Sequence, residues 1–171
     1  MTPQITMAGP ELVAALTDLV NRVYADGEKG LWGPGAARTD QAEIAGLIER
    51  GEIAVARVGG RLAGAVRVRV LDEERGELGM LVAEPEQQGT GIGRELVRFA
   101  ERWGREQGLA IMQLELLMPL EWEHPVKGFL RDWYTRIGYR QVSVGDLAED
   151  FPHLAAQLAT PCAFLIFHKT L

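Results

Sequence analysis

Three glycines at alternate positions, Gly89, Gly91 and Gly93, are the residues whose types and spacing most clearly suggest chemistry. They follow an apolar run and precede an amphipathic one, so they lie where a strand becomes a helix. Glycine has no Cβ atom, which lets the backbone approach a ligand closely. The first helical turn also offers unpaired N–H groups and the positive end of the helix dipole. The stretch therefore predicts a phosphate-binding turn, although such glycines can also serve packing alone.

The residues around these glycines narrow the class of phosphate-containing ligand that the turn could bind. No Gly-Lys-Ser/Thr follows, and a dinucleotide-binding Gly-x-Gly-x-x-Gly would need its third glycine one place later. The stretch 88–93, Gln-Gly-Thr-Gly-Ile-Gly, resembles instead the Gln/Arg-x-x-Gly-x-Gly/Ala motif of the GNAT family of N-acetyltransferases, which holds the pyrophosphate of acetyl-CoA. Residues 81–85, Leu-Val-Ala-Glu-Pro, are similar to that family's strand-to-loop lead-in.

This resemblance implies a binding site for acetyl-CoA. In the family, two central parallel strands splay apart, and the pantetheine arm pairs with backbone groups at the positions of Leu81 and Val82. A backbone N–H there can polarise the thioester carbonyl. The residues that the resemblance assigns to acetyl-CoA are Leu81, Val82, Ala83, Gln88, Gly89, Thr90, Gly91, Ile92, Gly93 and Arg94.

A second stretch, 133–139, reads Trp-Tyr-Thr-Arg-Ile-Gly-Tyr and resembles the family's aromatic-Tyr-x-x-Leu/Ile-Gly-Phe/Tyr signature. By that resemblance Tyr134 lies near the thioester sulfur, where its phenol can give a proton to a departing thiolate. The alternative is a tyrosine at a helix end that belongs only to the core. The chain departs from the family at Lys127 and Leu130, where many members have an asparagine and a small residue.

The reaction implied is direct attack of an amine on the acetyl carbonyl, for which a protonated amine must first lose a proton. The family often places a glutamate on the strand before the glycine turn, and Glu77 matches that position best, with a solvated strand-end role as the alternative. Other candidates for the base are Glu115, Glu121, Glu123 and His124. The candidate substrate-binding residues, aromatic or acidic, are Trp32, Glu121, Trp122 and Glu123.

Composition and charge limit the classes of function. The 171 residues suit one domain, 1–171, and the formal net charge of −6 disfavours a basic nucleic-acid-binding face. Cys162 has no partner for an internal disulfide, no signal peptide or membrane-spanning run is apparent, and a cytoplasmic protein is expected. The three histidines make no metal-ligand spacing with Cys162, so no metal is expected.

Strands and helices alternate along the whole chain. Expected strands cover 4–7, 52–58, 61–71, 77–83, 109–118, 139–144 and 162–169. Expected helices begin near Pro10, follow Asp40 to about residue 50, and cover 91–107, 126–137 and 146–158, the last broken near Pro152. A glycine-rich loop is expected at 24–35. The resemblance implies an α+β fold, with a mostly antiparallel sheet of about seven strands, a central splayed parallel pair, and helices on both faces.

The sequence therefore predicts an acetyl-CoA-dependent N-acetyltransferase that acts on an amine of a small molecule or peptide. A CoA-binding regulatory module without catalysis, or an acyltransferase with another acyl group or acceptor, is the alternative. The apolar run 163–167 fits either an internal strand or an edge strand that pairs with a second copy in a homodimer.

Overall fold

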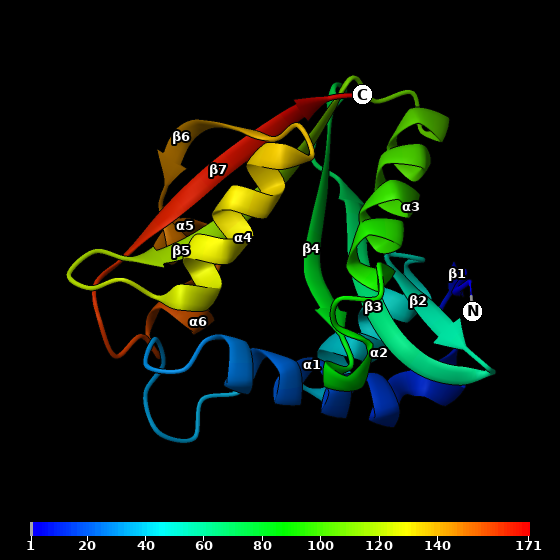
Figure 1. The fold of residues 1–171 in the computed structure, drawn as a ribbon, viewed down its shortest axis with the longest axis horizontal. Helices are drawn as coiled ribbons and strands as arrows, with labels where there is room; N and C mark the ends of the chain where they lie inside the picture. The colour runs from blue at the N-terminus through cyan, green and yellow to red at the C-terminus, as the bar shows by residue number, and fades with distance from the viewer. Residues whose placement is uncertain (1) are drawn as a thin grey trace.

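A single seven-stranded sheet organises the computed structural model, which describes residues 2–171 (Figure 1). The strand order is β1-β2-β3-β4-β5-β7-β6, and every neighbouring pair is antiparallel except β4 and β5. The strands are β1 (Gln4–Met7), β2 (Ile53–Val58), β3 (Arg61–Val70), β4 (Arg75–Ala83), β5 (Ile111–Pro119), β6 (Arg140–Gly145) and β7 (Cys162–Thr170). The predicted mixed sheet with one central parallel pair is therefore confirmed.

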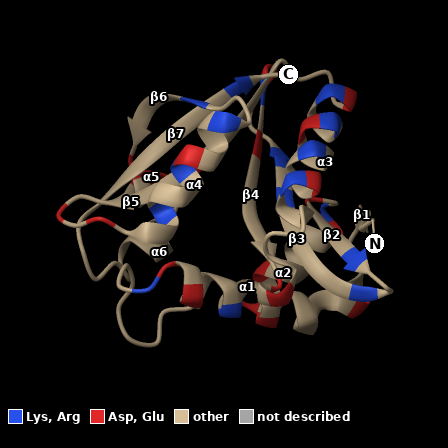
Figure 2. Ribbon diagram, viewed as in Figure 1, with Lys and Arg blue, Asp and Glu red and all other residues tan. Residues whose placement is uncertain are grey.

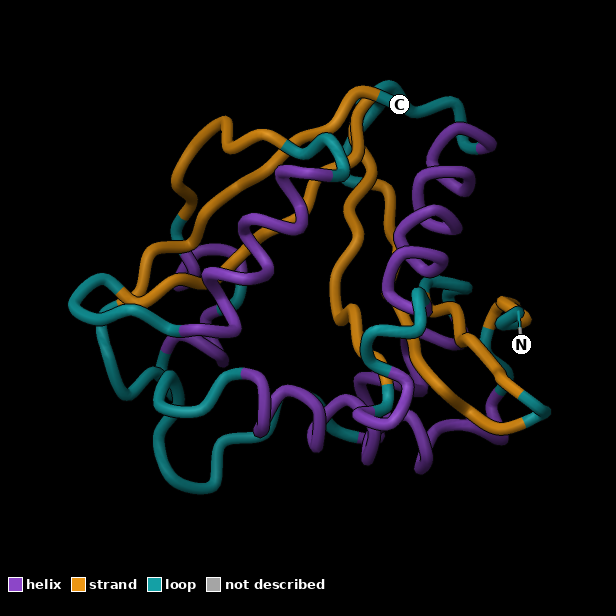
Figure 3. Tube along the Cα trace, viewed as in Figure 1, coloured by secondary structure: helices purple, strands orange, loops and turns teal. Residues whose placement is uncertain are grey.

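Helices cover both faces of the sheet (Figure 3). The α-helices are α1 (Val13–Gly27), α2 (Gln41–Glu49), α3 (Ile92–Glu106), α4 (Pro125–Arg136), α5 (Leu147–Asp150) and α6 (Pro152–Ala155), and short 3-10 turns cover Pro10–Leu12 and Pro85–Gln87. Apolar side chains of α3 and α4 form one core with the sheet, and those of α1 and α2 form another with its opposite face. None of the helices in the described range is long and apolar enough to cross a membrane.

Local sequence signals explain most element boundaries. The Asp40 side chain accepts a hydrogen bond from the Glu43 amide at 2.8 Å and so caps the start of α2. Gly59 and Gly60 both have positive φ, at 58° and 78°, as a two-residue hairpin between β2 and β3 requires. One expectation was wrong in detail: α1 continues to Gly27, so Tyr24 is helical rather than in a loop. The expected break near Pro152 is confirmed, because it separates the short helices α5 and α6.

The last strand is internal. β7 lies between β5 and β6, with its backbone paired on both sides, so the sheet edge on this side is β6 (Figure 1). Of the two arrangements compatible with the apolar run 163–167, the structure has the internal strand.

A bulge in β4 reorients the side chains that approach the centre of the molecule. Between the pairs Ala65–Val82 and Arg67–Gly79, β4 contains one residue more than β3. Met80 lies in this bulge with φ of 45°, a left-handed conformation that is rare outside glycine. Because of the extra residue, Leu78 packs with α3 and α4, whereas Met80 and Val82 pack with α1 and α2.

Candidate active site

The parallel strands β4 and β5 separate at the centre of the sheet and leave a cleft of about 630 Å³. Their pairing covers only three positions and ends at Glu77–Gln113 (Figure 1). Beyond this point, the edge of β4 that faces β5 has no strand partner, although its other edge remains paired with β3. An unpaired strand edge offers a row of backbone donors and acceptors to an extended ligand. Leu81, Val82 and Ala83, predicted to bind the pantetheine arm, line this cleft.

The glycine turn closes one end of the cleft and has the conformation of an anion-binding turn. Gly89 and Gly91 have φ of 81° and 90°, and a Cβ atom built on either residue would meet nothing within 4 Å. The first amide of α3 that donates to a backbone carbonyl is that of Glu95, at 3.0 Å from the Gly91 oxygen. Within residues 2–171, the amides of the first turn, 92–94, have no backbone acceptor. Open space and free donors therefore coincide at the positive end of a 15-residue helix.

The side chains of the turn divide between the core and the cleft. Ile92 and Val82 bury their side chains in the two cores, so only their backbone groups are available to a ligand. Gln88 and Arg94 are exposed and line the cleft, and Gln88 Nε2 lies 3.5 Å from the Ala83 oxygen. Thr90 is exposed, and its hydroxyl donates to the Gln87 carbonyl. This set of groups fits a pyrophosphate, which needs backbone N–H donors and one nearby cation.

Tyr134 lies in the opposite wall of the cleft. It belongs to α4, is 7% exposed, and packs against Trp133 and Tyr139 at ring-centroid distances of 5.0 and 6.1 Å. Tyr134 is part of a core and also lines the cleft. Its position is therefore compatible with both alternatives, a proton donor and a core tyrosine. Burial raises the pKa of Tyr134, so its phenol stays protonated near neutral pH and can only donate.

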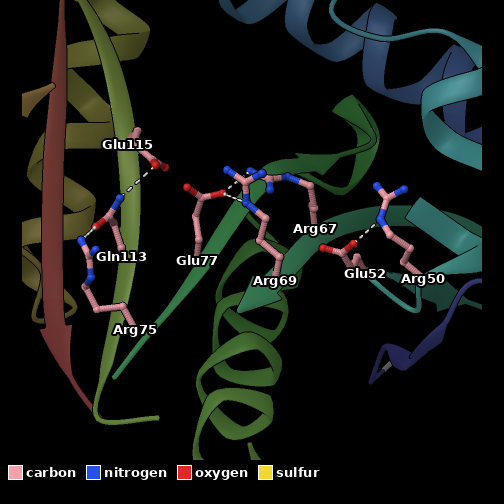
Figure 4. A network of polar contacts seen from close by, with 8 residues as sticks. All are labelled: Arg50, Glu52, Arg67, Arg69, Arg75, Glu77, Gln113 and Glu115. Atoms are coloured by element: carbon pink, nitrogen blue, oxygen red, sulfur yellow. Dashed lines mark hydrogen bonds and ion pairs between the residues drawn. The ribbon is translucent and has the colours of Figure 1, made fainter. Parts of the chain in front are cut away.

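Two carboxyl groups face each other where β4 and β5 separate. Glu77 lies on β4 and Glu115 on β5, and their side chains point toward one another (Figure 4). Glu77 is 1% exposed, and its Oε1 lies 2.7 Å from both Arg67 Nη2 and Arg69 Nε. Glu115 receives a hydrogen bond from Gln113 Nε2 at 3.1 Å. Glu77 is therefore no solvated strand-end residue. Glu115 lines the cleft, and Glu77 lies buried behind it with two guanidinium groups beside its carboxylate.

The two members of this pair have pKa values displaced in opposite directions. Burial opposes ionisation of Glu77, but the hydrogen bond with Glu115 and the charges of Arg67 and Arg69 outweigh it and lower the pKa. Burial raises the pKa of Glu115, and its hydrogen bond to the charged Glu77 adds to the effect. The pair therefore shares one proton near neutral pH, and Glu115 holds it.

The predicted substrate-binding residues do not gather at the cleft. Glu121 and Glu123 are exposed and line neither the cleft nor the smaller cavity beside it. The Trp122 indole donates to Thr160 Oγ1 at 3.2 Å and covers Gly30 from outside. Trp32 lines a second, smaller cavity of about 90 Å³, and its indole donates to Glu28 Oε1 at 2.9 Å. Their substrate-binding role stays a prediction.

A buried ion pair between Glu28 and Lys127 was not predicted. Both side chains are at most 7% exposed, and the Lys127 ammonium bonds to the Glu28 carboxylate. Glu28 follows the end of α1, whereas Lys127 lies in the first turn of α4, 99 residues later. The sequence signalled only that Lys127 departs from the family pattern at this position. Sequence reasoning gave no indication of its partner.

The larger cleft and the smaller cavity adjoin. The residues that line both are Tyr24, Glu28, Gly79, Met80, Glu115 and Lys127. The cleft between β4 and β5 and the smaller cavity therefore share a wall that includes Glu115. No group of three or more His, Cys, Asp and Glu side chains in residues 2–171 is arranged to hold a metal ion.

Comparison with known proteins agrees with this geometry. The model of the acetyltransferase (GNAT) family matches residues 16–141, so the chain belongs to this family. The comparison with curated protein sequences gives no match. The family assignment therefore comes from the family model, and the similarity to solved structures concerns the fold.

Several solved structures share the fold at low sequence identity. The PaiA N-acetyltransferase from Thermoplasma acidophilum, in complex with coenzyme A, is 16% identical over all of both chains, with a TM-score of 0.76. An aminoglycoside 6′-N-acetyltransferase complexed with coenzyme A is 17% identical over 98% of this chain and 96% of that one, with a TM-score of 0.73. The N-acetylglutamate synthase from Neisseria gonorrhoeae, complexed with coenzyme A and N-acetyl-glutamate, is 15% identical, with a TM-score of 0.71. This chain is fully covered in that comparison but spans 35% of the synthase.

Proposed function

We propose that the protein is an N-acetyltransferase that transfers the acetyl group of acetyl-CoA directly to the primary amine of a small molecule or peptide. One observation carries the proposal: the glycine turn, Tyr134 and Glu115 all line the cleft between β4 and β5, and Glu77 lies buried beside Glu115. A ligand-binding cleft with free backbone donors would suit many anions. The additional acid and base groups suit acyl transfer.

Acetyl-CoA would be held mainly by backbone groups. The amides of Gly91, Ile92 and Gly93 would bind the pyrophosphate, with Arg94 as the nearby cation. The unpaired edge of β4 at Leu81 and Val82 would bind the pantetheine arm as a further strand and polarise the thioester carbonyl. This binding brings the thioester and the amine together, which is where most of the rate gain of such a reaction arises.

The transfer itself needs one proton acceptor and one proton donor. The amine nitrogen forms a bond to the acetyl carbon, and the bond from that carbon to sulfur breaks. Glu115, rather than the predicted Glu77, is the better proton acceptor, because two arginines already hold Glu77 and weaken it as a base. Tyr134 donates its proton to the departing sulfur, and no covalent intermediate on the protein forms.

A CoA-binding module without catalysis is the second candidate. Lys127, at the position of the family's asparagine, is the specific observation that favours it, because its ammonium is committed to Glu28. A regulatory module would bind coenzyme A as tightly as an enzyme does, but it would release no thiol when amines are added.

The proposed activity is tested by thiol release from acetyl-CoA with a panel of primary amines, and by the mass of the acetylated amine. We expect turnover by the wild type and a fall in kcat of about 10- to 100-fold in Tyr134→Phe, at unchanged affinity for acetyl-CoA. Tyr139→Phe is the matched control, because Tyr139 is equally buried on the same core but lines no part of the cleft. Coenzyme A binding without turnover of any amine would favour the regulatory module.

A further inference from the structure

Arg38 is the one cation lining the smaller cavity that has no carboxylate partner among residues 2–171. Of the other cations that line this cavity, Lys127 is paired with Glu28, and Arg67 with Glu77. The Arg38 guanidinium instead lies over the ring of Tyr24, 5.2 Å from its centroid, and within residues 2–171 it makes no ion pair with a carboxylate. A guanidinium offers a planar fork of donors that matches a carboxylate in two hydrogen bonds.

The segment that carries Arg38 is anchored. The amide of Thr39 donates to Asn21 Oδ1, and Asn21 Nδ2 donates to the Thr39 carbonyl, both at 3.0 Å. These two bonds tie residue 39 to α1, and Asp40 begins α2 immediately afterwards. The backbone next to Arg38 is therefore fixed, and its side chain is half-buried over Tyr24 rather than free in solvent.

A carboxyl pair that carries one negative charge near neutral pH borders the same cavity through its member Glu115. Glu115 lines the cavity on the side of the larger cleft, where its carboxyl group faces Glu77 (Figure 4). The walls between Arg38 and Glu115 are mainly aromatic and aliphatic, with Trp32, Phe151 and Leu154 among them. The cavity of about 90 Å³ has room for about three water-sized groups, which is the size of a carboxylate. A ligand with one cationic and one anionic end, a few atoms apart, would meet a complementary group at each end.

We infer that the acceptor is a small amine that also carries a carboxylate, as an amino acid does. Arg38 binds the carboxylate in the smaller cavity, and the amine lies beside Glu115 where the two cavities meet. This inference rests on the proposed acetyl transfer and adds to it the class of acceptor. If Arg38 only stacked on Tyr24, removal of the acceptor's negative charge would leave kcat/KM unchanged.

The test compares L-amino acids with their primary amides, beginning with glycine, methionine and phenylalanine. An amide keeps the amine and the side group but has no negative charge. We expect the wild type to prefer the acid over its amide at least tenfold in kcat/KM for the best acceptor, since a hydrogen-bonded charge contributes about 10- to 100-fold. Intrinsic reactivity acts in the opposite direction, because the amine of an amide is less basic than that of the acid and more of it is unprotonated. A preference for the acid would therefore come from the protein.

Two substitutions of Arg38 and one remote control separate the outcomes. Arg38→Gln should bring the acid-to-amide ratio close to one, because kcat/KM falls more for the acid than for the amide, and Arg38→Lys should restore part of the preference. Arg57→Gln is the remote control: this half-buried arginine on β2 lines neither cavity, and the variant should keep the wild-type ratio. Calorimetric binding of the amino acid to the CoA-saturated protein should weaken in Arg38→Gln by the same factor.

Two results would overturn the inference: a wild-type ratio near one, or an equal loss on acid and amide in Arg38→Gln. In either case acetylation of amines would still support the proposed function. If neither acids nor amides nor other amines are acetylated, the proposed function itself fails, and the inference with it.

Discussion

The glycine turn and the smaller cavity both border the cleft, but the turn offers backbone groups and the cavity is lined by side chains. The turn consists of consecutive residues, 88–94, and offers mainly backbone groups fixed by a strand and a helix. The cavity consists of side chains from α1, β4, β5, α4 and the 28–40 segment, balanced by buried ion pairs (Figures 1 and 4). A site of the first kind is fixed by local sequence and suits a ligand common to a family. A site of the second kind can change with any of its distant contributors.

Charge is distributed differently in the two regions as well. Along α3, behind the glycine turn, arginines are interspersed with glutamates, and all of these residues except Glu101 are exposed or half-buried (Figure 2). Beside the smaller cavity, the charges of Glu28, Glu77, Arg67 and Lys127 are all buried. Surface pairs contribute little to stability, whereas removal of one member of a buried pair leaves an uncompensated charge. The comparison therefore predicts where substitutions unfold the protein and where they only remove binding.

The largest effect is expected for Lys127→Met. This substitution leaves the buried Glu28 carboxylate without its partner, and we expect the free energy of unfolding to fall by about 3–5 kcal/mol in denaturant titrations. Lys29→Met is the matched control: Lys29 pairs with Asp26, both side chains are more than two-thirds exposed, and the loss should stay below about 1 kcal/mol.

The double variant Glu28→Gln with Lys127→Met sharpens this first prediction. It removes both charges, so most of the lost stability should return. If Lys127→Met and Lys29→Met have equal, small effects, the smaller cavity does not depend on its buried charges, and the contrast with the glycine turn disappears.

Gly91→Glu should abolish binding without unfolding the protein. It introduces a side chain and a negative charge into open space beside the free amides, so we expect acetyl-CoA affinity to fall by at least about 100-fold in calorimetry. The substitution also strains a residue with φ of 90°. Gly60→Glu has comparable strain, with φ of 78° and open space, but lies in the β2–β3 hairpin. Equal loss of binding in both variants would mean that strain, not the anion site, is responsible.

The same contrast explains what the sequence could predict. All seven strands, the parallel pair and the cap at Asp40 follow from periodicity, glycine positions and the family resemblance, because these signals are local. The positions of the turn residues follow for the same reason. The end of α1 was missed because a glycine-rich run suggested a loop, although Tyr24 continues the apolar face of the helix.

The smaller cavity could not be predicted in this way. The pairing of Glu28 with Lys127 spans 99 residues, and the pairing of Arg67 with Glu77 depends on the register of two strands. Arg67 is buried although it is charged, because its guanidinium pairs with Glu77, two residues along β4 from Gly79, which lies opposite Arg67. Glu115 did carry a signal, since it is the only charged residue of an otherwise largely apolar strand. An isolated charge in such a strand indicates either a buried pair or a site, and here it belongs to both.

The pH dependence of activity tests whether Glu115 is the proton acceptor. With 2,2,2-trifluoroethylamine, an acceptor that is already neutral, kcat/KM should rise by about tenfold between pH 7 and 8, because only ionised Glu115 accepts a proton and its pKa is raised. Glu115→Gln should lower kcat/KM and remove this rise, whereas the exposed Glu106→Gln should retain it. A rise that persists in Glu115→Gln would assign the proton to another group.

The smallest effect concerns stability, and its sign follows from the same carboxyl pair. Glu115 has a raised pKa when folded, so between its unfolded value of 4.5 and the folded value the native state binds more protons than the unfolded chain. The stability that this group contributes therefore falls as pH rises from about 5 toward 9. Glu77, with a lowered pKa, acts in the opposite direction and only below pH 4.5.

Glu115→Gln should flatten the decline on the alkaline side in denaturant titrations, whereas Glu106→Gln should not. A decline as steep in Glu115→Gln as in the wild type would show that the pair does not share a proton, and the smaller cavity would then differ from the glycine turn in shape but not in electrostatics.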